Sequence, residues 1–181
     1  EGTLYRRAHI EVIDEINTKG LWMLHCCIYP HIHNSAPIFG FDIVAGHNKI
    51  TGCFHDFSPA GDPNHNMINW FENTVSTLNW SKIRELPDWG KQIFSPAIIA
   101  ASNVQSSSEI AQIVNTVNVT SKYYLSRVAA TNNTVKSTVE AQNYYAQCQK
   151  QNPRTPKVIA ALGLNDQEVD TFIHQCLFPE I

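Results

Sequence analysis

The chain has 181 residues, enough for one domain with a sizeable core, and 43% of them are hydrophobic. This composition excludes a disordered polypeptide, and a formal net charge of −3 excludes the basic surface typical of nucleic-acid-binding proteins. No apolar run approaches the ~20 residues that cross a bilayer, so we expect no membrane span. We predict a single domain over residues 1–181 that acts as a monomer. An odd number of cysteines, five, indicates free thiols in a reducing cytoplasm.

The first half of the chain has the pattern of β-strands. The segments "RAHIEVI" (7–13) and "LWMLHCCIY" (21–29) flank "NTKG", which predicts a hairpin. The segments "FGFDIVA" (39–45) and "KITGCFHDF" (49–57) flank "GHN", which predicts a second hairpin. No glycine-rich phosphate loop follows any of these strands, so nucleotide binding is not expected.

The second half has the pattern of helices. Apolar residues recur on one helical face over 67–78, and a longer helix is predicted to begin at a capping box formed by Ser106 and Glu109. A short helix is expected over 156–163, and a last helix begins at the cap residue Asn165. Strands followed by helices favour an antiparallel sheet covered by helices, in an α+β or sandwich arrangement.

Residues 24–46, "LHCCIYPHIHNSAPIFGFDIVAG", hold three histidines, two adjacent cysteines and one aspartate. A zinc site needs three or four converging ligands, and neither C-x-x-C nor H-E-x-x-H occurs. We therefore interpret His31 and His33 as loop residues exposed to solvent and expect no metal. A metallohydrolase that uses His25, His31 and His33 is the alternative.

His25 and Asp42 differ from these loop histidines because each interrupts an apolar strand. A buried carboxylate without a partner is costly, so Asp42 should be paired or have a raised pKa. From spacing alone, a structural hydrogen bond between Asp42 and His25 and a catalytic pair are equally good interpretations.

Glu11 is expected beside this pair. If the "NTKG" hairpin pairs Glu15 with Leu21, Glu11 lies opposite His25 on the same face, and His9 lies one step further along. Ionisable side chains gathered on the inner face of a small sheet are typical of a pocket that transfers protons.

Several motifs together resemble one family. The segments "GLWMLHCCIYP", "PIFGFDIVAG", "HDFSP", "RELPDWGKQIFSP", "SNV" and "QCLF" occur in order and are similar to those of the ferredoxin-dependent bilin reductases. The similarity is to the branch of phycocyanobilin:ferredoxin oxidoreductase and its marine phage homologues, which include a phycoerythrobilin-forming enzyme. The resemblance implies an α/β fold, a three-layer α/β/α sandwich with a central antiparallel β-sheet. The N-terminal part of the family fold, ahead of Leu4, has no counterpart here, so we expect a truncated domain.

The resemblance also implies the chemistry. Family members bind biliverdin IXα between the sheet and the C-terminal helices, with no metal or flavin, and reduce it through radicals with electrons from reduced [2Fe-2S] ferredoxin. Asp42 matches the aspartate that protonates the bilin, His25 its histidine partner, and Glu11 a glutamate associated with reduction of the exovinyl group, although the hairpin here is about two residues longer. The residues that the resemblance implies for substrate binding are His9, Thr51, Asn152, Arg154 and Leu177.

One departure affects substrate binding. The family has an arginine two residues before "SNV", where this chain has Ala100. A propionate-binding cation is therefore missing or replaced, and Lys91 or Arg127 are the candidates.

We expect a four-electron reduction of biliverdin IXα to phycoerythrobilin through 15,16-dihydrobiliverdin, in a cyanobacterial cell or a phage-infected host. Ala100, the longer hairpin and an Asn-rich chain favour this product. Phycocyanobilin is the alternative product. A non-catalytic bilin carrier or chromophore lyase is the alternative from another class.

Overall fold

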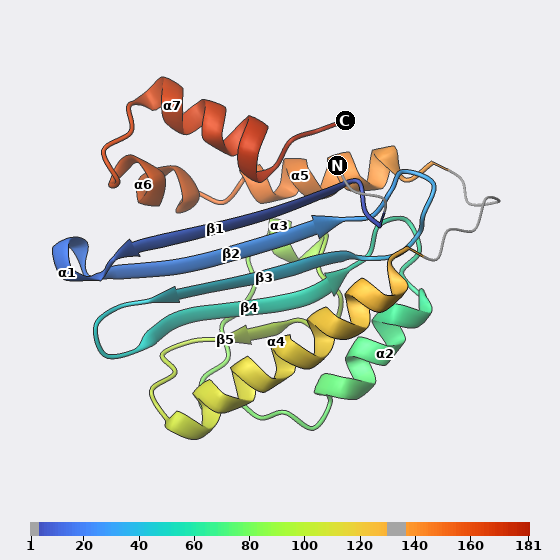
Figure 1. The fold of residues 1–181 in the computed structure, drawn as a ribbon, viewed down its shortest axis with the longest axis horizontal. Coiled ribbons are helices and arrows are strands. Elements are labelled where there is room, and N and C mark those ends of the chain that lie inside the picture. Colours follow the sequence, from blue (N-terminus) through green and yellow to red (C-terminus); the bar gives the residue numbers. More distant parts are fainter. Residues whose placement is uncertain (1–3, 130–136) are drawn as a thin grey trace.

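A five-stranded antiparallel sheet with the order β1-β2-β3-β4-β5 forms the centre of the molecule (Figure 1). The computed structural model describes residues 4–129 and 137–181. The strands are β1 (Arg7–Glu15), β2 (Leu21–Tyr29), β3 (Ile38–Ala45), β4 (Ile50–Ser58) and β5 (Ile99–Ala101). The first four agree with the predicted strands. The fifth was not predicted, because a strand of three residues is too short to show an alternating pattern.

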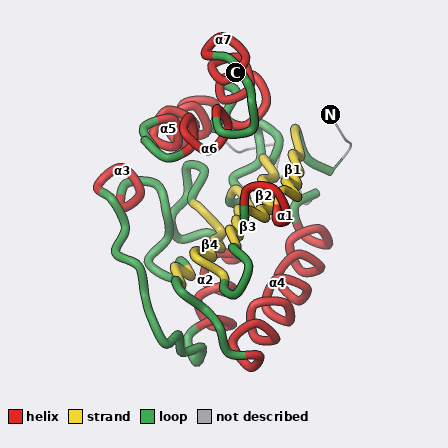
Figure 2. The backbone as a smooth tube through the Cα atoms, turned by 90° about the vertical axis from the view of Figure 1, so that its left-hand side faces the viewer, coloured by secondary structure: helices red, strands yellow, loops and turns green. Residues whose placement is uncertain are grey.

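Helices cover both faces of the sheet (Figure 2). The helices on one face are α2 (Asn66–Val75) and α4 (Ser107–Arg127). Those on the other face are α3 (Asp88–Lys91), α5 (Val139–Lys150), α6 (Thr155–Ala160), α7 (Asp166–Thr171) and the π-helix η1 (Phe172–Leu177). This arrangement is the predicted α/β/α sandwich.

The face under α2 and α4 carries an aromatic core. Phe39 and Phe57 are buried there with Phe71 of α2 and Tyr124 of α4, and the rings of Phe57 and Phe71 stack with centroids 4.7 Å apart. His55 lies among them, with Nδ1 2.7 Å from the carbonyl oxygen of Gly40 and Nε2 2.7 Å from the hydroxyl of a helix α4 threonine. Burial lowers the pKa of His55 to about 4, so this histidine is a neutral part of the core.

The connection between β1 and β2 is not the simple turn that "NTKG" predicted. It is a single helical turn, α1 (Ile16–Lys19), which ends at Gly20 with φ 63°. Glycine adopts this left-handed conformation without steric cost. The predicted register is nevertheless correct, because Glu15 pairs with Leu21 and Glu11 pairs with His25.

The predicted capping box of α4 was half wrong. The Ser106 hydroxyl accepts a hydrogen bond from the Glu109 amide, but the Glu109 carboxylate accepts hydrogen bonds from the Ser81 amide and the Ser106 hydroxyl and not from the Ser106 backbone amide. A reciprocal box does form at α7, where Asn165 and Glu168 satisfy each other's backbone amides.

Helix α5 was not predicted, because its buried face includes the polar Gln142 and its sequence "VEAQNYYAQCQK" shows no continuous apolar stripe.

The last predicted helix continues beyond α7 as a π-helix, with the amide of Phe178 bonded to the carbonyl oxygen of Ile173. This wider turn brings Leu177 and Phe178 to the cavity described next.

Candidate active site

One residue from each strand lies in a single row across the sheet. The register pairs Glu11 with His25, His25 with Asp42, Asp42 with Phe54, and Phe54 with Ala100. Directly paired residues project from the same face of an antiparallel sheet, which here is the face under α3, α5, α6 and η1. The hairpin register therefore places two carboxyl groups on either side of one imidazole.

A cavity of about 920 Å³ lies between this face and the C-terminal helices. Its size is near the upper end of the range of small-molecule sites, about 300–1,000 Å³. The residues predicted for the site that line it are Glu11, His25, Asp42, Thr51, Asn152, Arg154 and Leu177. Side chains that are far apart in sequence thus meet in one place.

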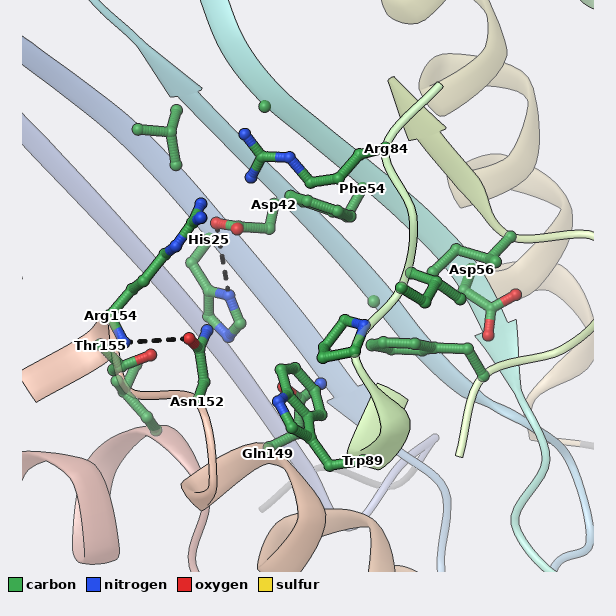
Figure 3. Close-up of a pocket in the computed structure, with 18 of the residues that line it drawn as sticks. His25, Asp42, Phe54, Asp56, Arg84, Trp89, Gln149, Asn152, Arg154 and Thr155 are labelled. Carbon is green, nitrogen blue, oxygen red and sulfur yellow. Dashed lines mark hydrogen bonds and ion pairs between the residues drawn. The ribbon is translucent and has the colours of Figure 1, made fainter. Parts of the chain in front are cut away.

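His25 and Asp42 face each other without a hydrogen bond (Figure 3). Nδ1 of His25 lies 3.8 Å from Oδ1 of Asp42, beyond the 2.7–3.2 Å typical of a structural hydrogen bond, and 34% of the Asp42 side chain is exposed. Among the described residues, Nε2 of His25 and Oε2 of Glu11 are buried and have no hydrogen-bond partner. Buried polar atoms without partners are costly unless a ligand satisfies them, so this geometry favours a binding site over a purely structural pair.

The carboxyl group of Glu11 retains its proton more readily than an exposed glutamate. Burial raises the pKa of Glu11, nearby His25 opposes this effect, and the negative charge of Asp42 adds to it. Glu11 can therefore hold a proton at a pH where an exposed glutamate is ionised.

His9 lies behind His25 and does not line the cavity. Its ring centroid is 5.8 Å from that of His25 and 6.4 Å from that of Phe172 in η1. Burial, together with the positive charges of His25 and Arg7, lowers the pKa of His9 to about 4. His9 therefore packs against the rings of His25 and Phe172, and its role in substrate binding stays a prediction.

The predicted substrate-binding residues enter from two sides. The Thr51 hydroxyl, on β4, donates a hydrogen bond to the carbonyl oxygen of Val44 at 3.0 Å. Oδ1 of Asn152, just before α6, accepts one from the Arg154 amide at 3.1 Å. Figure 3 shows the Arg154 side chain extending from this bend toward Asp42.

Arg84 and Asp56 were not predicted from the sequence. Arg84 lines the cavity ahead of α3, within the "RELPDW" motif that supported the family resemblance. Asp56 is buried and accepts hydrogen bonds from the Ser95 amide and hydroxyl and from the Ser58 hydroxyl. Burial raises the pKa of Asp56 to about 6 against these hydrogen bonds. Asp56 lies two residues after Phe54 on β4 and therefore projects from the same face, and this spacing could have identified it.

Lys91 and Arg127 were the candidates for replacing the missing arginine, and only Lys91 lines the cavity. Arg127 was a wrong choice, because it belongs to α4 on the opposite face, where its guanidinium lies over the Tyr123 ring at 5.8 Å. Lys91 lines the cavity, but its ammonium lies 3.6 Å from Glu85 and 3.5 Å from Asp88. These carboxylates already neutralise Lys91.

The metallohydrolase hypothesis requires His25 to meet His31 and His33. Neither loop histidine lines the cavity that contains His25. In the described part of the chain, no group of three or more His, Cys, Asp or Glu side chains is placed to hold a metal ion. Over the same residues, no helix is long and apolar enough to cross a membrane.

Comparisons with known proteins show the family to which the chain belongs. The model of the ferredoxin-dependent bilin reductase family matches residues 3–179. Phycocyanobilin:ferredoxin oxidoreductase of Prochlorococcus marinus (strain MIT 9515) is 30% identical over 187 aligned positions, which cover 96% of this chain and 72% of that protein. The enzyme of the same name from Synechococcus sp. (strain CC9605) is 30% identical, with coverage of 96% and 71%.

Two solved structures share the fold. A structure of PcyX superimposes with a TM-score of 0.67 at 30% identity and covers 97% of this chain and 75% of its own. Phytochromobilin synthase from tomato in complex with biliverdin has a TM-score of 0.73 at 17% identity, with coverage of 93% and 63%.

Together with the row of acid–base groups, these matches define an oxidoreductase of bilins. The chain belongs to the ferredoxin-dependent bilin reductase family, whose electrons come from ferredoxin.

Proposed function

We propose that the cavity binds biliverdin IXα and that the chain reduces it with four electrons and four protons to a phycobilin. Four reduced [2Fe-2S] ferredoxins each supply one electron, and cavity side chains supply the protons. The proposed product is phycoerythrobilin, formed through 15,16-dihydrobiliverdin. All five cysteines are free thiols, which is consistent with a reaction in a reducing cytoplasm.

The observation that carries this proposal is the row of Glu11, His25 and Asp42 on the cavity wall. Adding an electron to a conjugated tetrapyrrole makes it more basic, so each electron transfer favours a proton transfer. A carboxyl group and an imidazole within reach of the ligand can supply that proton. The cavity is also large enough for a tetrapyrrole, and the tomato relative was solved with biliverdin.

The experiment is anaerobic turnover. Adding biliverdin IXα should give a coloured complex, and reduced ferredoxin should then shift its absorbance as double bonds are removed. A complex that forms and stays unchanged with reduced ferredoxin would instead identify a bilin carrier or chromophore lyase, which needs the cavity but no proton donors.

One observation favours a second product, phycocyanobilin. The longer hairpin leaves Glu11 in register opposite His25 and on the cavity wall, because α1 accommodates the extra length. The family resemblance associates a glutamate at this position with reduction of the exovinyl group.

Glu11→Gln distinguishes the two products. If phycoerythrobilin is the product, the variant should still form 15,16-dihydrobiliverdin, because exovinyl reduction is not required. Chromatography of a time course with the wild type and the exposed Glu72→Gln control, on α2, measures this. An early bilin reduced at the 18-vinyl group in the wild type, lost in Glu11→Gln, would assign phycocyanobilin instead.

A further inference from the structure

The segment over residues 177–181, here called the strap, packs against the cavity. It begins at the last residue of the π-helix η1 and passes to the side of α5 (Figure 1). Leu177 and Phe178 of the strap line the cavity. The Phe178 ring meets the His25 imidazole edge to face, with centroids 5.8 Å apart and an interplanar angle of 85°. The strap therefore contacts one of the proposed proton-transfer residues.

Packing, and not hydrogen bonding, orients the His25 imidazole in the described part of the chain. Nε2 is buried without a hydrogen-bond partner, and Nδ1 lies 3.8 Å from Oδ1 of Asp42. The rings that flank the imidazole are those of His9 and Phe178. The terminal torsion of a histidine has broad minima, so an imidazole without hydrogen bonds turns unless its neighbours confine it. The orientation of His25 thus depends on where the strap holds Phe178.

Helix α5 binds the end of the strap through three polar side chains. Their spacing of four and then three residues places them on one face of the helix. Asn143 accepts a hydrogen bond from the Ile181 amide at 2.8 Å, and its Nδ2 donates to the Ile181 carbonyl oxygen at 3.4 Å. Gln147 and Lys150 donate to the two carboxylate oxygens of Glu180 at 2.7 and 2.6 Å. The Glu180 carboxylate is therefore the centre of this contact.

The ion pair between Lys150 and Glu180 is only partly open to water. The exposed fraction is 14% for the Lys150 side chain and 36% for that of Glu180. Hydrogen bonds from Lys150 and Gln147 lower the pKa of Glu180, so its carboxylate is ionised at neutral pH. A charged hydrogen bond of this kind is stronger than one between neutral groups.

A second anchor holds the chain on the other side of Phe178. Nη2 of Arg7, at the start of β1, donates to the carbonyl oxygens of Gln175 at 3.1 Å and Cys176 at 2.6 Å. The last carbonyl groups of a helix have no partner within the helix, and Arg7 supplies one. Phe178 thus lies in the chain between an anchor on β1 and an anchor on α5.

We propose that Glu180 is a positioning residue, which acts through Phe178 to hold the His25 imidazole in the orientation for proton transfer to the bilin. The carboxylate fixes the strap on α5, and the strap fixes the ring edge against His25. This inference rests on the proposed function, because the step that it controls is the proton transfer that accompanies an electron from ferredoxin.

Charge reversal and charge exchange test the contact between the strap and α5. Glu180→Lys and Lys150→Glu each place like charges together, so each should slow the single-turnover reduction of bound biliverdin by about 10- to 100-fold, since a displacement of ~1 Å costs about 100-fold. The Kd of biliverdin should change by less than about threefold. The double variant restores an ion pair, so its rate should return to within about threefold of the wild type.

A second measurement reports on His25 without any substrate. In the ligand-free protein with ¹⁵N-labelled histidine, Glu180→Lys should shift or broaden the ring signals of His25, and the double variant should restore them. His55 is the internal reference, because both of its ring nitrogens are bonded on the opposite face of the sheet, so its signals should stay unchanged. A general loss of structure would move both histidines.

Two further variants complete the test. Glu140→Gln removes an exposed carboxylate of α5 outside the cavity, so its rate and signals should match the wild type. In a Phe178→Leu background, Glu180→Lys should cause less than about a threefold further loss of rate, because the group through which it acts is already gone. Thermal melting shows that each variant is folded.

The outcomes distinguish this inference from the proposed function. Wild-type rates in Glu180→Lys, an unchanged His25 spectrum, or a charge exchange that restores neither would overturn the positioning role, while turnover by the wild type would still support the proposed function. If the wild type does not reduce biliverdin, the proposed function fails and the inference fails with it, whatever the histidine spectra show.

Discussion

Asp42→Asn is expected to lower the rate of bilin reduction by about 100- to 10,000-fold, the usual contribution of a positioned acid or base. Asparagine has nearly the same shape as aspartate but no acidic proton to donate. Asp42 lines the cavity with a third of its side chain exposed, so the exchange leaves the cavity shape unchanged. The Kd of biliverdin should therefore change by less than about tenfold, and reduction should stop at a radical that electron paramagnetic resonance detects.

The matched control is Asp14→Asn. Asp14 is exposed on β1, and its side chain projects from the face opposite the cavity, so turnover should match the wild type. Full turnover by Asp42→Asn, with biliverdin bound normally, would show that another group delivers the proton.

Phe57→Ala should have the largest effect on stability. Phe57 is fully buried, stacks on Phe71, and has Tyr124 and Phe39 within ring-contact distance, with centroids at 5.4 and 5.9 Å. Removing a buried phenyl ring loses the transfer free energy and leaves a cavity, so the free energy of unfolding should fall by about 3–5 kcal/mol. Urea unfolding followed by circular dichroism measures the change.

Ile10→Ala is the comparison, because Ile10 is 68% exposed on β1 and its truncation should cost less than about 0.5 kcal/mol. The biliverdin Kd of folded Phe57→Ala should remain near the wild-type value, since Phe57 faces α2 and α4. Equal unfolding free energies for the two variants would mean that the aromatic cluster does not stabilise the fold.

The strands and their register were predictable because their information is local. Alternation along β1 and β2 sets which side chains share a face, and pairing Glu15 with Leu21 is enough to bring Glu11 opposite His25. His25 meets Asp42 through the pairing of β2 with β3, whose register was not predicted because the longer loop of residues 30–37 joins these strands.

The parts that were missed depend on contacts between distant segments. Helix α5 buries Gln142, whose amide bonds to the carbonyl oxygen of Pro30, so its polar inner face gives no periodic signal. Arg84 reaches the cavity because its backbone amide bonds to the carbonyl oxygen of Ala100 in β5, a contact that does not follow from local spacing. The distance between His25 and Asp42 decides whether they form a structural hydrogen bond or an open pair, and it does not follow from their spacing in the sequence.

The single helical turn α1 joins β1 and β2 at one end of the sheet (Figure 1), and its residues are not among those that line the cavity. Because the turn closes on Gly20 and returns the chain to the same register, length can be added there without shifting Glu11 relative to His25. This loop is therefore a natural insertion point, where a peptide tag or a tether to an electron donor could be built into the enzyme while the reaction centre keeps its alignment.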